Sequence, residues 1–223
     1  MWIPFFISSL FLLLLLEVPG FALSRMMRFC RLDSILIAPL FSIALLEIVS
    51  IVISKLGIFA TWVNLCLICF ILAAIFLSCK LIDCSRKAAM TEFFFGHSNW
   101  LILFLYCGVA FVVATKIFLL PLDGPSSFIQ DSDNSFHLAV IRSFLDVGDF
   151  STFNVGLYHD VPSSSILSIA NGFYPAAWHL LAALVASFSG QDVAFAANVT
   201  NYVMVLFVFP SSVLLFFKNG ISR

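Results

Sequence analysis

The stretch SILIAPLFSIALLEIVSIVIS, residues 34–54, contains a single charged residue, Glu47. A helix needs about 20 mostly apolar residues to cross roughly 30 Å of hydrocarbon, so this stretch predicts a membrane span. Comparable runs, bounded by charges, Gly or Pro, occupy residues 2–19, 57–79, 99–120, 173–189 and 194–217. The sequence therefore predicts an all-α integral membrane protein with about six transmembrane helices.

The composition excludes most other classes of protein. The chain is 62% hydrophobic and 10% charged, whereas soluble domains are about 45–50% apolar. Its formal net charge of -1 provides no basic surface for a phosphate backbone, so we expect no nucleic-acid partner. The partner that the composition does indicate is membrane lipid, and we expect a multi-pass protein of the cell membrane.

Basic residues predict which side each loop faces. Loops 20–33 and 80–98 each carry three Lys or Arg residues, and the positive-inside rule places both in the cytoplasm. With one crossing per predicted span, the N-terminus and segment 121–172 fall outside, and the turn 190–193 falls inside. The last residues, with Lys218 and Arg223, then fall outside, against the rule. That conflict indicates either an error in the last span or a chain that is incomplete at its C-terminus.

Segment 121–172 is the predicted extracytoplasmic loop. It holds six of the twelve acidic residues and only one basic residue, Arg142. Asp133 can cap a helix over residues 134–147, which Gly148 would end. The apolar row of that helix consists of Phe136, Val140, Phe144 and Val147. Such an amphipathic helix is expected to lie on the membrane or against the helix bundle.

We therefore expect two parts: a three-helix membrane segment over residues 1–98, and a second module over 99–217 that consists of a span, the loop 121–172 and two further spans.

Two stretches contain residue types suited to chemistry. Asp133 and His137 are four residues apart, so a helix places them on one face, with Asp131 close by. Carboxylates beside an imidazole can hold a divalent cation or act as a general base. Asp133 could equally be only a helix cap, with His137 a surface residue. His179, one turn inside an apolar run, can face protein or a water-filled cavity, and a purely structural role is an equal alternative.

Four stretches carry a resemblance that covers nearly the whole chain. They are Val18-Pro19-Gly20, Ala38-Pro39-Leu40-Phe41-Ser42, the segment from Asp133-x-x-Phe136-His137 to Asp149-Phe150-Ser151, and Tyr174-Pro175-Ala176-Ala177-Trp178-His179. Together they resemble an uncharacterised family of large bacterial polytopic membrane proteins.

The layout is also similar to the N-terminal module of GT-C glycosyltransferases, which use polyprenyl-phosphate-linked sugars. In those enzymes an apolar helix leads into an outer loop with essential acidic residues and a juxtamembrane helix, and the chain then returns to the membrane. Here three predicted helices precede that module and few follow it, which fits a truncated relative with an N-terminal extension.

The GT-C resemblance implies a role for each candidate residue. Asp133, Asp131 and His137 would be catalytic, and Arg142, Tyr174 and His179 would contact the substrate. The cofactor is unknown, with a divalent cation held by Asp131 and Asp133 as the candidate. The alternative function is non-catalytic: a transporter part or a scaffold for cell-envelope assembly.

Overall fold

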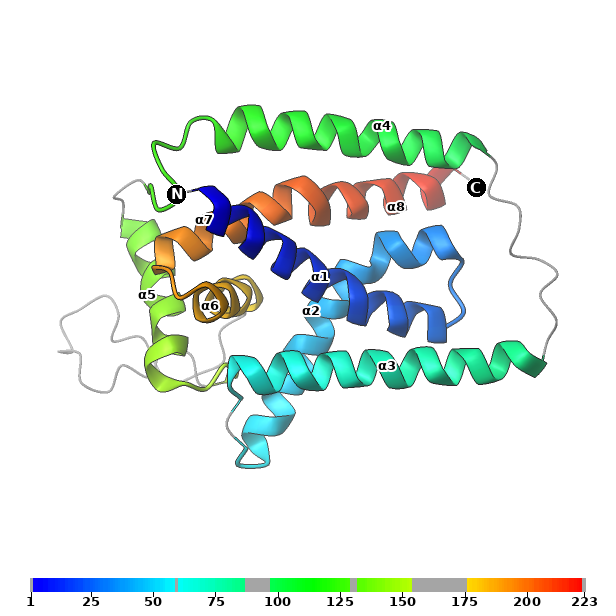
Figure 1. Cartoon of the computed structure of the whole chain (residues 1–223), viewed down its shortest axis with the longest axis horizontal. Coiled ribbons are helices and arrows are strands. Elements are labelled where there is room, and N and C mark those ends of the chain that lie inside the picture. The colour runs from blue at the N-terminus through cyan, green and yellow to red at the C-terminus, as the bar shows by residue number, and fades with distance from the viewer. Residues whose placement is uncertain (1, 59, 87–96, 129–131, 154–175, 222–223) are drawn as a thin grey trace. The chain divides into compact units, whose positions relative to one another are not determined.

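The computed structural model describes residues 2–58, 60–86, 97–128, 132–153 and 176–221. Every regular element in these ranges is helical, and Figure 1 shows their arrangement. The elements are α1 (Trp2–Met26), α2 (Arg31–Lys55), α3 (Trp62–Arg86), α4 (His97–Val113), η1 (Ala114–Leu119), α5 (Ser132–Val147), α6 (Ala177–Ser189), α7 (Val193–Val203), η2 (Met204–Val208) and α8 (Phe209–Ile221). The segments η1 and η2 are π-helical continuations of α4 and α7.

Four helical runs are long and apolar enough to cross a membrane: α1, α2, residues Trp62–Cys79 of α3, and residues Val193–Phe216 through α7, η2 and α8. Much of their apolar surface is exposed. Ile3 of α1, for example, is 74% exposed, and an exposed apolar surface of this extent is suited to lipid contact rather than to water. These helices indicate that the chain is an all-α membrane protein, as predicted.

Among the described residues, fewer helices have the length and composition of a membrane span than the six that the sequence predicts. The predicted span 99–120 corresponds to α4 and η1, in which Phe104–Leu119 forms a shorter apolar helix. The predicted span 173–189 corresponds to α6, which has 13 residues. At 1.5 Å per residue α6 is about 20 Å long, which is short of the roughly 30 Å of hydrocarbon that a span must cross.

The chain forms two compact units, each assembled from separate segments. The first consists of Met1–Leu12, Leu46–Ile68 and Leu122–Asn201, and the second of Leu13–Leu45, Cys69–Pro121 and Tyr202–Arg223. Both units draw on segments from the two sides of residue 98, where the sequence predicts a domain boundary. That boundary stays a prediction.

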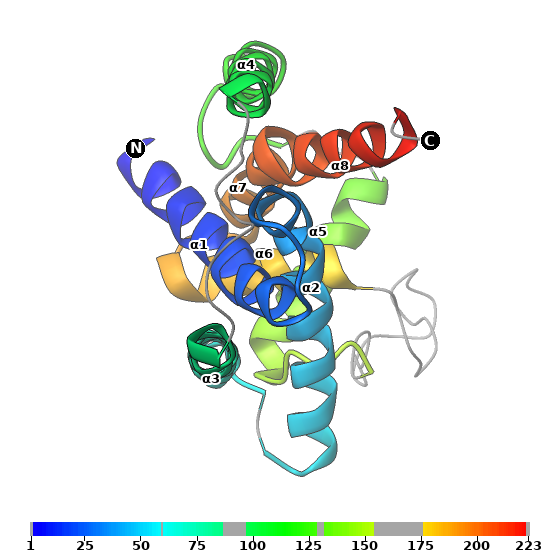
Figure 2. The same ribbon diagram turned by 90° about the vertical axis from the view of Figure 1, so that its right-hand side faces the viewer.

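A close crossing of α1 and α2 characterises the second unit. The backbone N–H of Gly20 donates a hydrogen bond to Ser42 Oγ at 2.7 Å. A Cβ atom at position 20 would collide with the carbonyl oxygen of Ala38, so glycine is what permits this approach. In the same unit α4 packs against η2 and α8; in Figure 2 α4 is seen end-on, above α8.

In the first unit α5 packs against α6. Figure 1 views α6 along its axis while α5 runs vertically, so the two helices cross steeply. α6 is buried on every side, with all side chains from His179 to Ala186 buried, as expected of a helix that is apolar all round. Gly148, with a φ of 70°, follows the last residue of α5 and ends the helix as predicted.

Candidate functional site

The buried face of α5 includes His137. The buried apolar residues of this helix are Val140, Ile141 and Phe144, which lie three, four and seven residues after His137 and so on the same side of the helix. Of the predicted apolar row, Val140 and Phe144 are buried against protein, whereas Val147 is 45% exposed. The buried face is centred on Ile141 rather than on the predicted row, which places His137 against α6.

His137 meets His179 at the crossing of α5 and α6. The two atoms His137 Nδ1 and His179 Nε2 are 2.8 Å apart, and the ring centroids are 5.0 Å apart. His179 lies in the first turn of α6 and is 4% exposed, whereas His137 is half-buried. The pair therefore extends from a partly accessible imidazole into a buried one.

The hydrogen bond limits how many protons the pair can carry. One of the two bonded nitrogens must donate and the other must accept, so both imidazoles cannot be fully protonated while the bond persists. Burial, together with the nearby His137, lowers the pKa of His179 to about 4. His179 is therefore neutral at pH 7, and its neighbour sets its tautomer.

Trp178 completes the surroundings of the pair. Its ring contacts His179 edge to face, with centroids 5.0 Å apart, and His137 at 6.0 Å. The indole N–H donates to Asn201 Oδ1 of α7 at 2.9 Å. The sequence analysis gave neither Trp178 nor Asn201 a role in the site. The adjacency of Trp178 to His179 and the presence of an amide in an apolar run were the available signals.

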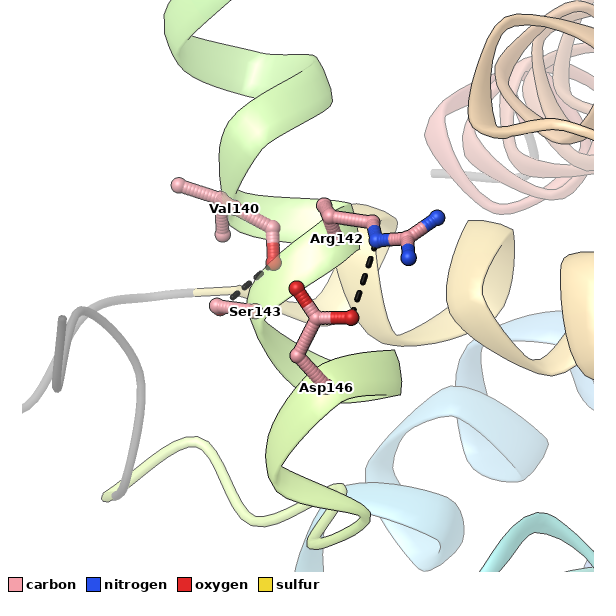
Figure 3. A network of polar contacts seen from close by, with 4 residues as sticks. All are labelled: Val140, Arg142, Ser143 and Asp146. Carbon is pink, nitrogen blue, oxygen red and sulfur yellow. Dashed lines mark hydrogen bonds and ion pairs between the residues drawn. The ribbon is translucent and has the colours of Figure 1, made fainter.

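Arg142 lies on a different face of α5 from the imidazole pair. Five residues separate it from His137, which corresponds to about 140° around the helix. Its Nε donates to Asp146 Oδ1 at 2.9 Å, and both side chains are largely exposed. Figure 3 shows this contact beside the Ser143 hydroxyl, which donates to the Val140 carbonyl at 2.7 Å. The structure thus brings together His137 and His179 and sets Arg142 apart from them.

The acidic candidates are only partly described. Asp133 is the second residue of α5, so it lies inside the first helical turn, although the sequence predicted it as the residue before the helix. A carboxylate in the first turn is favourable for the helix dipole. Asp131 and Tyr174 lie outside the described residues. Within the described ranges, no three or more His, Cys, Asp or Glu residues are grouped as metal ligands, and the cation site at Asp131 and Asp133 stays a prediction.

The residues after α5 are fixed to the end of α2. Asp149 accepts hydrogen bonds from the Ser54 hydroxyl at 2.8 Å and from the Ser151 N–H at 3.1 Å. The N–H of Phe150 donates to the carbonyl of Ala60 at 3.1 Å. The C-terminal end of α5 is therefore held at the turn between α2 and α3, while His137 holds the N-terminal half of α5 on α6.

The chain belongs to a family of unknown function, DUF6541, whose model matches residues 13–221. This agrees with the expectation of an uncharacterised family. No curated protein and no solved structure matches the chain.

Proposed function

We propose that this family member is a membrane enzyme that transfers a sugar from a polyprenyl-phosphate carrier at the non-cytoplasmic surface. The observation that carries the proposal is the hydrogen bond between His137 and His179, because it joins the helix of the polar segment to the following apolar helix through two titratable side chains. The order of elements supports it as well: α4, then α5 with Asp133 in its first turn, then the apolar α6.

Proton transfer is the role that suits this site. As the acceptor oxygen bonds to C1 of the sugar, the hydroxyl proton passes to a base, and the C1–O bond to the phosphate breaks with its electron pair leaving on polyprenyl phosphate. Asp133, with Asp131 beside it, is the proposed base. If His137 donates through Nδ1 to His179, then its Nε2 is the unprotonated nitrogen and can accept from the acceptor hydroxyl. His179 then orients His137.

The leaving phosphate needs positive charge. Arg142 is the only Lys or Arg in segment 121–172, and a divalent cation at Asp131 and Asp133 is the other proposed source. The ion pair to Asp146 uses Arg142 Nε, and the two Nη atoms point away from that carboxylate in Figure 3. A phosphate can therefore approach Arg142 without displacing Asp146. Tyr174 is proposed to contact the substrate from the start of the predicted span.

A non-catalytic role, as a transporter part or an envelope-assembly scaffold, is favoured by one observation. His179 is 4% exposed and lies in a helix interface, where hydrogen-bonded side chains also serve to hold helices together in membranes. In that case the two imidazoles only fasten α5 to α6, and no lipid-linked substrate is consumed.

The test compares Asp133→Asn and Asp133→Ala in a deletion strain, with membrane protein level, complementation and lipid-linked sugars in lipid extracts all measured. If Asp133 only supports the first turn of α5, its loss should cost about 0.3–1 kcal/mol through the helix dipole, and the small cost left in Asp133→Asn should not affect function. A base is not rescued, because Asn lacks both charge and basicity. We expect both variants and His137→Ala to reach the membrane, fail to complement, and leave a polyprenyl-phosphate sugar accumulated.

Asp146→Asn is the matched control, since it makes the same chemical change on the exposed side of the same helix; it should complement. Full activity of Asp133→Asn would contradict the catalytic role. Loss of complementation with no lipid-linked sugar accumulating would favour the scaffold.

A further inference from the structure

The two ends of α6 can each be assigned to a side of the membrane. α5 carries exposed charges at Arg142 and Asp146 and is not among the apolar helices, so both of its ends lie on one side. Residues 154–172, between the described part after α5 and the predicted fifth span, contain no apolar run of span length in the sequence. The first turn of α6 bonds to α5 through His179. The chain therefore enters α6 on the side of α5.

The C-terminal end of α6 is fixed to the loop that precedes α5. Gly190 ends the helix with a φ of 65°. Two residues later Asp192 accepts a hydrogen bond from the Ser126 hydroxyl at 2.7 Å. The side-chain amide of Asn198, in α7, donates to the carbonyls of Pro125 at 3.0 Å and Ser127 at 2.7 Å. Because residues 122–128 and α5 belong to the same polar segment, α6 ends on the side where it began.

Aromatic contacts connect the C-terminal end of α6 to the α2–α3 turn, independently of these hydrogen bonds. Phe188, in the last turn of α6, stacks on Phe11 of α1 with centroids 3.9 Å apart and meets Trp62 edge to face at 6.4 Å. Trp62 is the first residue of α3, directly after the turn whose Ala60 carbonyl accepts the Phe150 N–H. The end of α6, the α2–α3 turn and the residues after α5 thus lie on the same side.

The direction of α6 also indicates that both of its ends lie on one side of the membrane. α6 and α7 up to Asn201 belong to the first unit. In Figure 1 α6 is seen along its axis, whereas α7 runs across the picture, and in Figure 2 α6 is seen from its side. α7 begins the run Val193–Phe216 that is long enough to cross a membrane. A helix steeply inclined to α7 lies more nearly along the membrane plane than across it.

We infer that α6 does not cross the membrane: the chain enters and leaves it on the non-cytoplasmic side, so that α5 and α6 form one layer there and the chain crosses five times. The crossings are α1, α2, α3, α4 with η1, and α7 with η2 and α8. A six-span arrangement would put Asp192 across the membrane from Ser126, to which it is hydrogen-bonded.

The distribution of charge supports five crossings. With α6 on one side, the end of α8 and the residues after it fall on the cytoplasmic side, together with the basic loops 20–33 and 80–98. Lys218 and Arg223 then obey the positive-inside rule, and the conflict that six spans create is removed. The inference holds whether or not the imidazole pair is catalytic. It adds that Asp192 and the candidate residues share one compartment.

Cysteine labelling separates the two arrangements. In the full chain without its native cysteines, Gln191→Cys, at an exposed position in the turn after α6, is treated with a membrane-impermeant thiol reagent in intact cells. Ser164→Cys, in the polar segment, is the outer control, and Ser85→Cys, beside Arg86 at the C-terminal end of α3, is the inner control. We expect Gln191→Cys to be labelled to the same extent as Ser164→Cys. Labelling only after permeabilisation, as for Ser85→Cys, would overturn the inference.

A reporter fused after Arg223 distinguishes five crossings from six independently of cysteine labelling. It does so even if the thiol at position 191 reacts neither in intact nor in permeabilised cells. Five crossings predict a fluorescent protein that folds in the cytoplasm and an alkaline phosphatase that stays inactive. Active phosphatase at this position, with a dark fluorescent protein, would restore the six-span arrangement.

Discussion

The crossing of α1 with α2 and the crossing of α5 with α6 are built on different principles. At the first, Gly20 lets two backbones meet, and its N–H donates to Ser42. At the second, two imidazoles share a hydrogen bond. Both devices, small residues and polar contacts, are usual between membrane helices. The difference is that neither group bonded at the first crossing, a backbone N–H and a hydroxyl, changes its protonation near neutral pH, whereas the second crossing depends on the protonation of two imidazoles.

The largest expected effect comes from breaking the second crossing through its apolar face. Phe144 is 1% exposed and stacks on Phe150 with centroids 5.9 Å apart. Truncating a buried Phe costs about 3–5 kcal/mol, and Phe144→Asp adds the cost of a buried carboxylate. We expect α5 to detach and become sensitive to protease in purified protein. Val147→Asp, at an exposed position of the same helix, should remain protected. Equal protection of both variants would mean that α5 is not held by this face.

Gly20→Ala should break the first crossing. The added Cβ meets the Ala38 backbone carbonyl and comes within 2.8 Å of Ser42 Oγ, so the helices must separate. Overpacking of this kind costs about 1–3 kcal/mol, and we expect the upper end because a backbone atom is struck. The measurement is the thermal aggregation temperature in detergent. Gly108→Ala is the control, since a Cβ there meets nothing within 4 Å; identical temperatures for both variants would show that the crossing is loose.

A double-mutant cycle sharpens the comparison at the imidazoles. His137→Ala, His179→Ala and the double variant should give a coupling within about 0.5–3 kcal/mol, because each single change leaves the other buried nitrogen without its partner at 2.8 Å. The free energy of unfolding is measured by detergent denaturation at pH 7. Additive single effects would show that the hydrogen bond contributes nothing to stability.

The second crossing should weaken in acid, and the first should not. Because the pKa of His179 is lowered to about 4 in the folded protein and is about 6.5 in a model peptide, the released state binds more protons between these values. Docking of α5 on α6 is therefore fully present above about pH 6.5 and is lost as the pH falls toward 4. Protease sensitivity of α5 against pH measures this. A flat profile, or one unchanged in His179→Ala, would contradict it.

The smallest effect is expected at Arg142. Its ion pair with Asp146 is exposed, with side chains 63% and 47% accessible, and surface pairs of this kind contribute about 0.2–1 kcal/mol. Arg142→Ala should therefore leave α5 docked and the unfolding free energy nearly unchanged. If Arg142 meets a phosphate as proposed, activity falls while stability does not. A stability loss as large as that of His179→Ala would place Arg142 in the helix interface instead.

The sequence by itself determined the class of the protein and much of its local structure. The apolar runs predicted membrane helices, the patterning at 134–147 predicted α5, and Gly148 predicted its end. These features depend on residues within a few helical turns of one another. The hydrophobic period and the composition of the segment are therefore enough to predict them. The same patterning did not specify which part of the apolar row packs against protein, because that depends on the neighbouring helices: Val140 and Phe144 are buried, and Val147 is exposed.

Only the tertiary structure decided which residues meet. His137 and His179 are 42 positions apart, and Gly20 and Ser42 are 22 apart, so no local pattern specifies either contact. The bond from Ser126 to Asp192 likewise spans 66 positions, and it places both ends of α6 on one side although its composition resembles that of a span. Composition reports how a segment partitions between water and lipid, whereas the crossing of helices fixes which polar groups come within hydrogen-bonding distance.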